Sequence, residues 1–267
     1  MIGDTERKRT VAEVFDRAAP TYDSVAGSYF SYFGPRIAAA AAIPPGSTVL
    51  DVACGKGAVL LPAAENGAAI ALGTDISLEM VRSARSRAEE RGVDNVCTVV
   101  MDGDRLALPS GSVDVLTCAF SLHFFADIPA LLSEFTRVLR SGGTIALSEW
   151  GAEDERWQWE SDLIGALPGR GVTTASFQGA GDLESLSVQT GVIDVRTAVE
   201  ELDVYLSSEE EWWTWKWSYS FRYVLEQLDA PTLERFKKEA FARAREMDDG
   251  DGLPLTLQAF IATGRKP

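Results

Sequence analysis

A glycine-rich turn with an acidic residue at its mouth is the part of the chain best suited to chemistry. Residues 49–57 read Val-Leu-Asp-Val-Ala-Cys-Gly-Lys-Gly, and the apolar residues at their start are typical of a strand buried on both faces. Gly55 and Gly57 let the backbone turn sharply and approach a ligand closely. A dinucleotide-binding turn would carry a third glycine beside the pyrophosphate, where this chain has Leu60. Asp51 would repel a pyrophosphate but suits an ammonium group, so the turn predicts a cofactor with a nucleoside and a cation, such as S-adenosylmethionine.

A second acid lies at the end of the next predicted strand. Residues 68–74 are small or apolar and lead to Asp75, the position at which doubly wound sheets place an acceptor for ribose hydroxyls. Ile76 and Met80 follow within one helical turn and are expected to sandwich the adenine, although Met80 also fits an ordinary core stripe. After the next strand, the segment Asp102-Gly103-Asp104-Arg105 offers a carboxylate and a backbone N–H group to the adenine edge.

These segments resemble the class I S-adenosylmethionine-dependent methyltransferases, in particular the small-molecule branch related to the ubiquinone and menaquinone C-methyltransferases. The resemblance covers residues 10–150. It is carried by VLDVACGKG, GTDISLEM, GDRLALP with SGSVDVLTCAFSLHFF, and FTRVLRSGGTIALSEW. It implies that a tyrosine of the N-terminal segment, Tyr22, folds over the cofactor. The alternative is that Tyr22 packs between that segment and the sheet.

Alternating elements predict the fold class, an α/β doubly wound, mostly parallel seven-stranded sheet. The expected strands cover 48–53, 70–75, 96–100, 113–119, 144–149, 192–205 and 255–263. The expected helices cover 11–15, 20–33, 57–65, 77–91 and 127–139, and Gly142-Gly143 is expected to end the last of these. Four parts follow: an N-terminal helical lid over 1–46, a cofactor-binding core over 47–150, a substrate-pocket insertion over 151–253 that includes the sixth strand and the aromatic helices, and a last strand over 254–267. The family places this last strand antiparallel beside the fifth.

The insertion contains an unusual aromatic helix. Ser208 and Glu211 form a capping box for a long helix, and Pro231 opens another that ends near residues 248–252. Residues 212–221 carry aromatic rings nearly all round the first helix, so more than one of its sides must be covered. Three interpretations are open: the rings pack in a core, they line the wall of an acceptor pocket, or they form a subunit interface. A pocket wall would imply a large apolar or aromatic acceptor.

Two residues at the ends of the fourth and fifth strands are candidates for catalysis, because that edge of the sheet faces the ligand crevice. His123 is the only histidine in the chain and is either the general base that deprotonates the acceptor or a residue that holds the cofactor. Glu149 is the second candidate base, or orients the acceptor. The full set of residues expected at the cofactor is Tyr22, Asp51, Ala53, Cys54, Gly55, Gly57, Asp75, Ile76, Met80, Gly103, Asp104, Arg105, Ala119 and His123.

Composition restricts the partners. The net charge is −15, from 40 acidic and 25 basic residues, which opposes a nucleic-acid substrate because phosphate contacts need Lys or Arg. The apolar runs are too short for a membrane helix and the first nine residues are polar, so we expect a cytoplasmic protein without a membrane partner. Cys54, Cys97 and Cys118 lack metal-ligand spacing and are interpreted as reduced core residues, so no metal site is expected.

The sequence therefore predicts a methyltransferase that uses S-adenosylmethionine and acts on a small, largely apolar or aromatic molecule of the secondary-metabolite type. Oxygen is favoured as the acceptor atom, then carbon, then nitrogen. The same motifs would also serve an enzyme that keeps the cofactor but catalyses another reaction, such as a cyclisation, or a non-catalytic cofactor-binding protein. The oligomeric state and the identity of the acceptor are left open.

Overall fold

A seven-stranded sheet organises the chain in the computed structural model, which describes residues 3–168, 171, 177 and 179–267. The strand order is β3-β2-β1-β4-β5-β7-β6, with β1 to β5 parallel and β7 antiparallel between β5 and β6. The predicted sheet and the antiparallel last strand are confirmed. The strands are β1 (Thr48–Val52), β2 (Ile70–Asp75), β3 (Val96–Val100), β4 (Val113–Ala119), β5 (Leu139–Trp150), β6 (Ile193–Leu206) and β7 (Leu253–Arg265).

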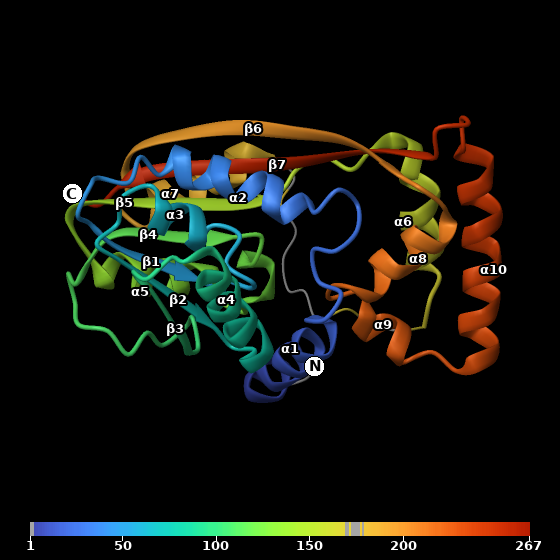
Figure 1. Ribbon diagram of the computed structural model, residues 1–267, viewed down its shortest axis with the longest axis horizontal. Helices are drawn as coiled ribbons and strands as arrows, with labels where there is room; N and C mark the ends of the chain where they lie inside the picture. The colour runs from blue at the N-terminus through green and yellow to red at the C-terminus, as the bar shows by residue number, and fades with distance from the viewer. Residues whose placement is uncertain (1–2, 169–170, 172–176, 178) are drawn as a thin grey trace.

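Helices cover both faces of this sheet (Figure 1). Alternate residues of each strand point to opposite faces, so Val49 packs toward α2 and α3 while Leu50 packs toward α5 and α7. The helices are α1 (Asp4–Ala18), α2 (Tyr29–Ala40), α3 (Leu60–Glu65), α4 (Leu78–Arg91), α5 (Ile128–Val138), α6 (Gln158–Gly165), α7 (Ala180–Gln189), α8 (Glu209–Trp217), α9 (Arg222–Glu226) and α10 (Ala230–Met247), with short 3-10 turns η1 (Leu122–Phe124) and η2 (Glu155–Trp157). No helix of the described residues is both long and apolar enough to cross a bilayer.

Helices α6, α8, α9 and α10, which we call the cap, gather at the far end of the β6–β7 hairpin, on the right of Figure 1. The hairpin reaches the cap because β7 extends past the end of β5. Trp150, the last residue of β5, pairs with Ala259, whereas β6 accompanies β7 back to Leu253. Before Ala259, at residues 253–258, β7 therefore has a strand on one side only.

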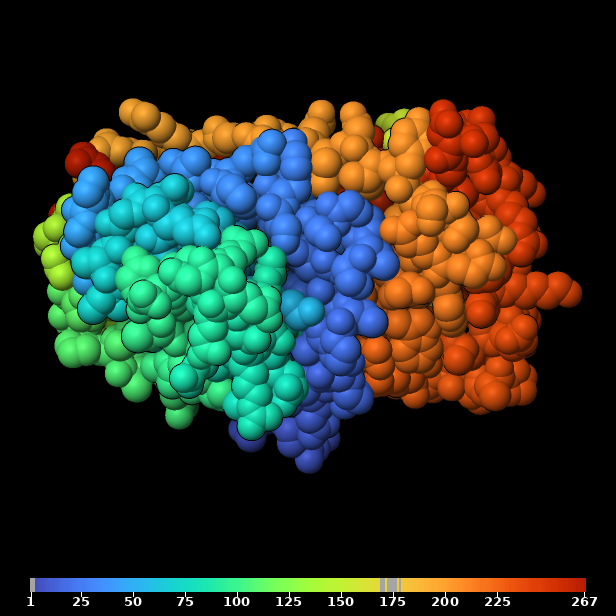
Figure 2. Space-filling model, viewed as in Figure 1, coloured from blue at the N-terminus to red at the C-terminus, as the bar shows by residue number. Residues whose placement is uncertain are grey.

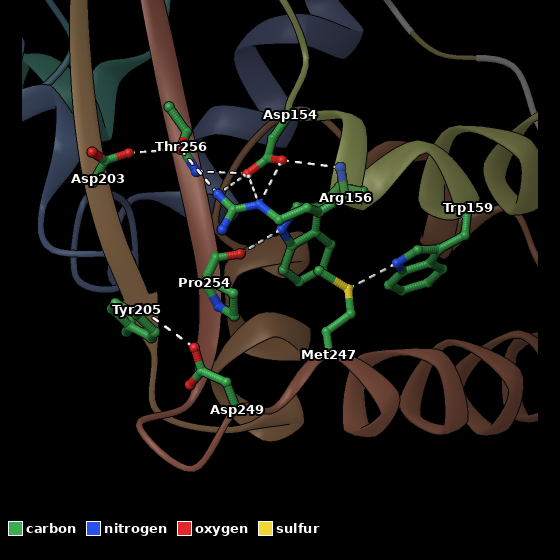
Figure 3. A network of polar contacts seen from close by, with 10 residues as sticks. Asp154, Arg156, Trp159, Asp203, Tyr205, Met247, Asp249, Pro254 and Thr256 are labelled. Carbon is green, nitrogen blue, oxygen red and sulfur yellow. Dashed lines mark hydrogen bonds and ion pairs between the residues drawn. The ribbon is translucent and has the colours of Figure 1, made fainter.

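Side chains from the segment after β5 replace the missing strand (Figure 3). The Asp154 carboxylate accepts the Thr256 N–H at 2.8 Å, and the indole N–H of Trp157 donates to the Pro254 carbonyl at 2.9 Å. Arg156 holds Asp154 in place through two guanidinium nitrogens. Two backbone groups that β7 leaves without a strand partner are thus satisfied by side chains, as partly buried polar groups must be.

Several local expectations were wrong, and each has a physical reason. The helix expected over 20–33 begins only at Tyr29, because residues 23–28 contain four positive φ angles. The long aromatic helix stops at Trp217, where the Ser218 hydroxyl donates to the Trp215 carbonyl and competes with the helical hydrogen bond. Cys97 is exposed, because β3 is an edge strand.

The glycine stop expected after α5 is also wrong. The helix ends at Val138 without it, and Leu139 already pairs with Val113 in the sheet. Gly142 and Gly143 lie in a bulge of β5, where Gly142 has a φ of 77° and the register between β4 and β5 shifts.

Candidate functional site

Two adjoining cavities open at the carboxyl ends of the parallel strands, where ligands of doubly wound sheets bind. Their volumes are about 730 and about 430 Å³. Both are lined by Tyr22, Ala53, Gly55, Ala119 and Phe120. The sequence predicted the first four of these as cofactor contacts. It gave no role to Phe120, which has a φ of 51° and follows β4 directly.

The larger cavity contains the residues predicted for the nucleoside. Asp75, Ile76, Met80 and Gly103 all line it. The Asp75 carboxylate accepts backbone N–H groups of Gly55 and Ser77, each at 2.9 Å, so it fixes the glycine turn to the start of α4. Burial raises the pKa of Asp75 to about 6, against the lowering effect of these two N–H groups.

Tyr22 lies over the glycine turn. Its ring stacks on Phe30 with the ring centroids 4.8 Å apart, and Lys56 of the turn donates to the Tyr22 carbonyl at 3.1 Å. Gly55 has a φ of 52°, and a Cβ atom there would stand 3.7 Å from the Tyr22 ring. A larger side chain at this position would fill the space between the ring and the turn.

Asp51 supplies a buried acid to the smaller cavity, which Cys54 also lines. Its side chain is 1% exposed, and its Oδ1 accepts the Thr117 hydroxyl at 2.6 Å. Its Oδ2 has no hydrogen-bond partner within the part of the chain that the structure describes. Burial raises the pKa of Asp51 to about 7, although the Thr117 hydrogen bond lowers it. A buried acceptor without a donor suits a cationic ligand group.

Four of the residues expected at the cofactor lie outside both cavities, and His123 is one of them. Gly57 faces the helices, because a Cβ atom there would stand 3.6 Å from the Ala84 Cβ. Asp104 pairs with Lys8 of α1 at 2.6 Å, and Arg105 is exposed. The sequence predicted a helix over 11–15 in the lid, but not that α1 brings Lys8 and Phe15 to the larger cavity. No local signal in this charged helix indicated where it would pack.

The two catalytic candidates are in contact with each other. The Nδ1 atom of His123 lies 2.7 Å from the Glu149 Oε2, and the His123 backbone N–H donates to the Glu149 Oε1 at 3.3 Å. They meet because β4 and β5 are neighbouring parallel strands, with Ala119 opposite Ser148. Neither lines the cavities, but Ser121 and Phe124, on either side of His123, line the larger one. Glu149 is 2% exposed, so the pair is well shielded from water.

The aromatic rings of α8 pack inside the cap. Trp212 is fully buried and its indole N–H donates to Glu160 of α6 at 3.1 Å, while Lys216 forms an ion pair with the same carboxylate. The indole N–H of Trp215 donates to the Tyr29 hydroxyl at 3.2 Å. None of the described α8 side chains lines either cavity. This arrangement supports the packing interpretation, and the pocket-wall and interface interpretations stay predictions.

Comparison with known proteins identifies the family. A family model described as a methyltransferase domain matches residues 50–147. Nocamycin O-methyltransferase of Saccharothrix syringae is 33% identical, with 94% of this chain and 97% of the relative aligned. The chain belongs to the class I S-adenosylmethionine-dependent methyltransferases. A second relative of this methyltransferase, aklanonic acid methyltransferase DauC of a Streptomyces species, is 34% identical over 54% of this chain and 67% of its own length.

Solved structures agree on the fold of the methyltransferase. The [4+2]-cyclase SpnF superposes with a TM-score of 0.61 at 19% identity and covers 97% of both chains. The cofactor is S-adenosylmethionine, and the cavities suit it. Asp51 offers an unpaired buried oxygen for an ammonium group, Asp75 lies on the wall of the larger cavity, and Gly55 leaves the turn open to a ligand.

Proposed function

We propose that this methyltransferase methylates an oxygen atom of a small, largely apolar or aromatic molecule of the secondary-metabolite type. The observation that carries the proposal is the similarity to nocamycin O-methyltransferase, which extends over nearly the whole of both chains. It therefore includes the cap, where acceptor-binding residues are expected, and not only the cofactor-binding core. Aklanonic acid methyltransferase supports the same class of acceptor.

For the cofactor, we propose that the adenosine occupies the larger cavity and the amino-acid end the smaller one. Asp75 would then accept the ribose hydroxyls, and Ile76 and Met80 would contact the adenine. The Asp51 Oδ2 would accept the ammonium group. Tyr22, which lines both cavities, would cover the junction between them, where the sulfur must lie. Ala53, Cys54 and Ala119 would contact the ligand through their small side chains or backbone.

His123 and Glu149 are proposed to act together as the base. When bound, S-adenosylmethionine supplies a methyl group activated by a sulfonium, so the chain has only to orient the acceptor and accept its proton. The His123 imidazole would take the proton of the acceptor hydroxyl, and Glu149, 2.7 Å from Nδ1, would stabilise the resulting imidazolium. In the alternative, His123 holds the cofactor, and the acceptor loses its proton without help from the pair.

A labelling experiment tests the acceptor class. The purified chain is incubated with S-adenosylmethionine labelled in its methyl group and with aklanonic acid, followed by a panel of phenols, enols, amines and carbon nucleophiles. We expect label on an acceptor oxygen. Label on carbon or nitrogen alone would refute O-methylation, and conversion of a substrate while the label stays on the cofactor would favour a cyclase-like reaction.

The remaining expectations on partners and location are part of the proposal. A nucleic-acid substrate is disfavoured by the charge of −15. Addition of tRNA or duplex DNA to the labelling assay should therefore produce no labelled polymer. The cytoplasmic location stays a prediction, which fractionation of cells with an antibody against the chain would test.

A further inference from the structure

The loop between α1 and α2, residues 20–28, has a strained backbone at the cofactor site. It carries Tyr22, and three of its other residues that are not glycine have positive φ: Asp23 at 58°, Ala26 at 53° and Ser28 at 54°. L-residues are disfavoured in this region, where the Cβ atom crowds the backbone. Such a conformation persists only where surrounding contacts enforce it.

Two of the contacts that hold this loop come from its immediate surroundings. The Asp23 carboxylate accepts backbone N–H groups of Phe30 at 2.9 Å and Ser31 at 3.2 Å, which ties the loop to the first turn of α2. Lys56 donates to the Tyr22 carbonyl, which ties it to the glycine turn. Neither contact reaches the strained stretch from Ala26 to Ser28.

Besides local backbone hydrogen bonds of Ser28, this stretch receives a side-chain hydrogen bond from the cap. One carboxylate oxygen of Glu211, in the first turn of α8, accepts the Ala26 N–H at 3.1 Å. Its other oxygen accepts the N–H and the hydroxyl of Ser207, each at 2.7 Å. Glu211 therefore joins the middle of the loop to the junction of β6 and α8, some 185 residues away in the sequence.

Two further contacts join the same N-terminal segment to the cap, one on each side of the loop. Arg17 of α1 binds both carboxylate oxygens of Glu226 in α9, at 3.0 and 2.6 Å. The Trp215 indole of α8 donates to the Tyr29 hydroxyl at the start of α2. Figure 2 shows the blue N-terminal segment directly against the orange cap.

We propose that Glu211 is a positioning residue for the cofactor: from the cap, it holds the strained loop that places Tyr22 over the glycine turn. Without this carboxylate the loop relaxes, Tyr22 leaves the turn, and the bound cofactor is released faster. The cap thereby controls how long the cofactor stays bound. The proposal rests on the placement of the cofactor beneath Tyr22 given above.

Glu211→Ala tests the proposal, with Glu210→Ala as the matched control. Both residues lie in the first turn of α8 and both substitutions remove one negative charge. Binding of S-adenosylhomocysteine is measured by calorimetry, and its release by stopped-flow tryptophan fluorescence. Glu211→Ala should weaken binding and speed release by about tenfold each, because the loop conformation that places Tyr22 over the glycine turn is then less populated. Glu210→Ala should behave like the wild type. Unchanged release from Glu211→Ala, or equal effects of the two substitutions, would overturn the proposal.

Ser28→Gly in the Glu211→Ala background separates positioning from a general loss of structure. Ser28 makes no capping hydrogen bond with its side chain, and glycine adopts its φ of 54° without strain. The added glycine should restore most of the binding lost, since the loop then needs less support. Weak binding that Ser28→Gly leaves unchanged contradicts the proposal. Failure of the wild type to bind S-adenosylhomocysteine would instead refute the cofactor placement, and the acceptor class is untouched by either result.

Discussion

Replacement of Asp51 by Asn should stabilise the protein without ligand and weaken its binding of the cofactor. The side chain is 1% exposed and one of its oxygens has no partner among the described residues, so its charge is poorly compensated. Asn keeps the shape and can still accept the Thr117 hydroxyl through its own oxygen. It cannot present a negative charge to an ammonium group.

The size of the effect on the free energy of unfolding follows from the pKa of Asp51. Burial raises this pKa from 3.8 to about 7, so the folded protein binds a proton more tightly than the unfolded chain. The stabilising effect of that proton is complete below pH 3.8 and is lost as the pH rises through 7. Because Asp51 ionises more easily in the unfolded chain, at 1.36 kcal/mol per pH unit the free energy of unfolding is lower than at acid pH by up to roughly 4 kcal/mol at pH 8, and by roughly 2 kcal/mol at pH 5.5.

Urea denaturation of the ligand-free protein between pH 5.5 and 8.5 measures the first effect. The Asn variant should be the more stable protein, and its advantage should about double over this range. Glu239→Gln, an equal change of charge on an exposed site of α10, should show no such trend. A variant no more stable than the wild type at pH 8, or an advantage independent of pH, would refute the reasoning.

Calorimetry with S-adenosylmethionine measures the second effect. At pH 8 the Asn variant should bind about 10- to 100-fold more weakly, the usual value of a hydrogen bond to a charged group. The wild type should lose about tenfold in affinity between pH 8 and pH 6, because Asp51 must then ionise before it binds the ammonium group. Affinity of the Asn variant should change much less with pH.

Three further substitutions test other parts of the site. Asp75→Ala should weaken S-adenosylmethionine binding by roughly ten- to a hundredfold in calorimetry, and unchanged affinity or a preference for NAD would contradict the placement of the ribose. Gly55→Val should abolish binding while the circular dichroism spectrum stays native-like, since its methyl groups would occupy the space under Tyr22. His123→Asn should keep the affinity for S-adenosylmethionine within a fewfold and lower turnover by about 10²–10⁴ if the histidine is the base. A fall in affinity at unchanged turnover would assign it to the cofactor cavity instead.

The parts of the fold that the sequence predicted are those encoded by neighbouring residues. The apolar run around Asp51 before the glycine turn and the run that ends at Asp75 are local signals for buried parallel strands and their ligand-facing ends. The structure confirms both strands, which end at Val52 and Asp75. The contact between His123 and Glu149 was within reach of the same reasoning. Each follows one of two adjacent parallel strands, and the ends of such strands lie side by side.

The parts that were wrong depend on contacts between distant residues. Nothing near Ala26 indicates a left-handed backbone, because the carboxylate that holds it belongs to Glu211. Asp104 was expected at the adenine, but its carboxylate forms an ion pair with Lys8 of α1. The early end of α8 is different, since Ser218 offers a local signal: serine hydroxyls often compete with helical hydrogen bonds.

The side chains that replace β5 along the outer half of β7 have a consequence for protein engineering. Asp154 and Trp157 bind backbone groups of β7, and both lie in the segment that follows Trp150. The contacts that hold this half of β7 therefore come from the same part of the sequence as the cap helices. The residues proposed to hold the cofactor all precede position 126. We therefore predict that residues 151–253 can be exchanged between relatives as one segment. An exchange that carries over the acid at 154, the indole at 157 and the carboxylate at 211 that holds Ala26 should alter the choice of acceptor while the cofactor site stays as it is.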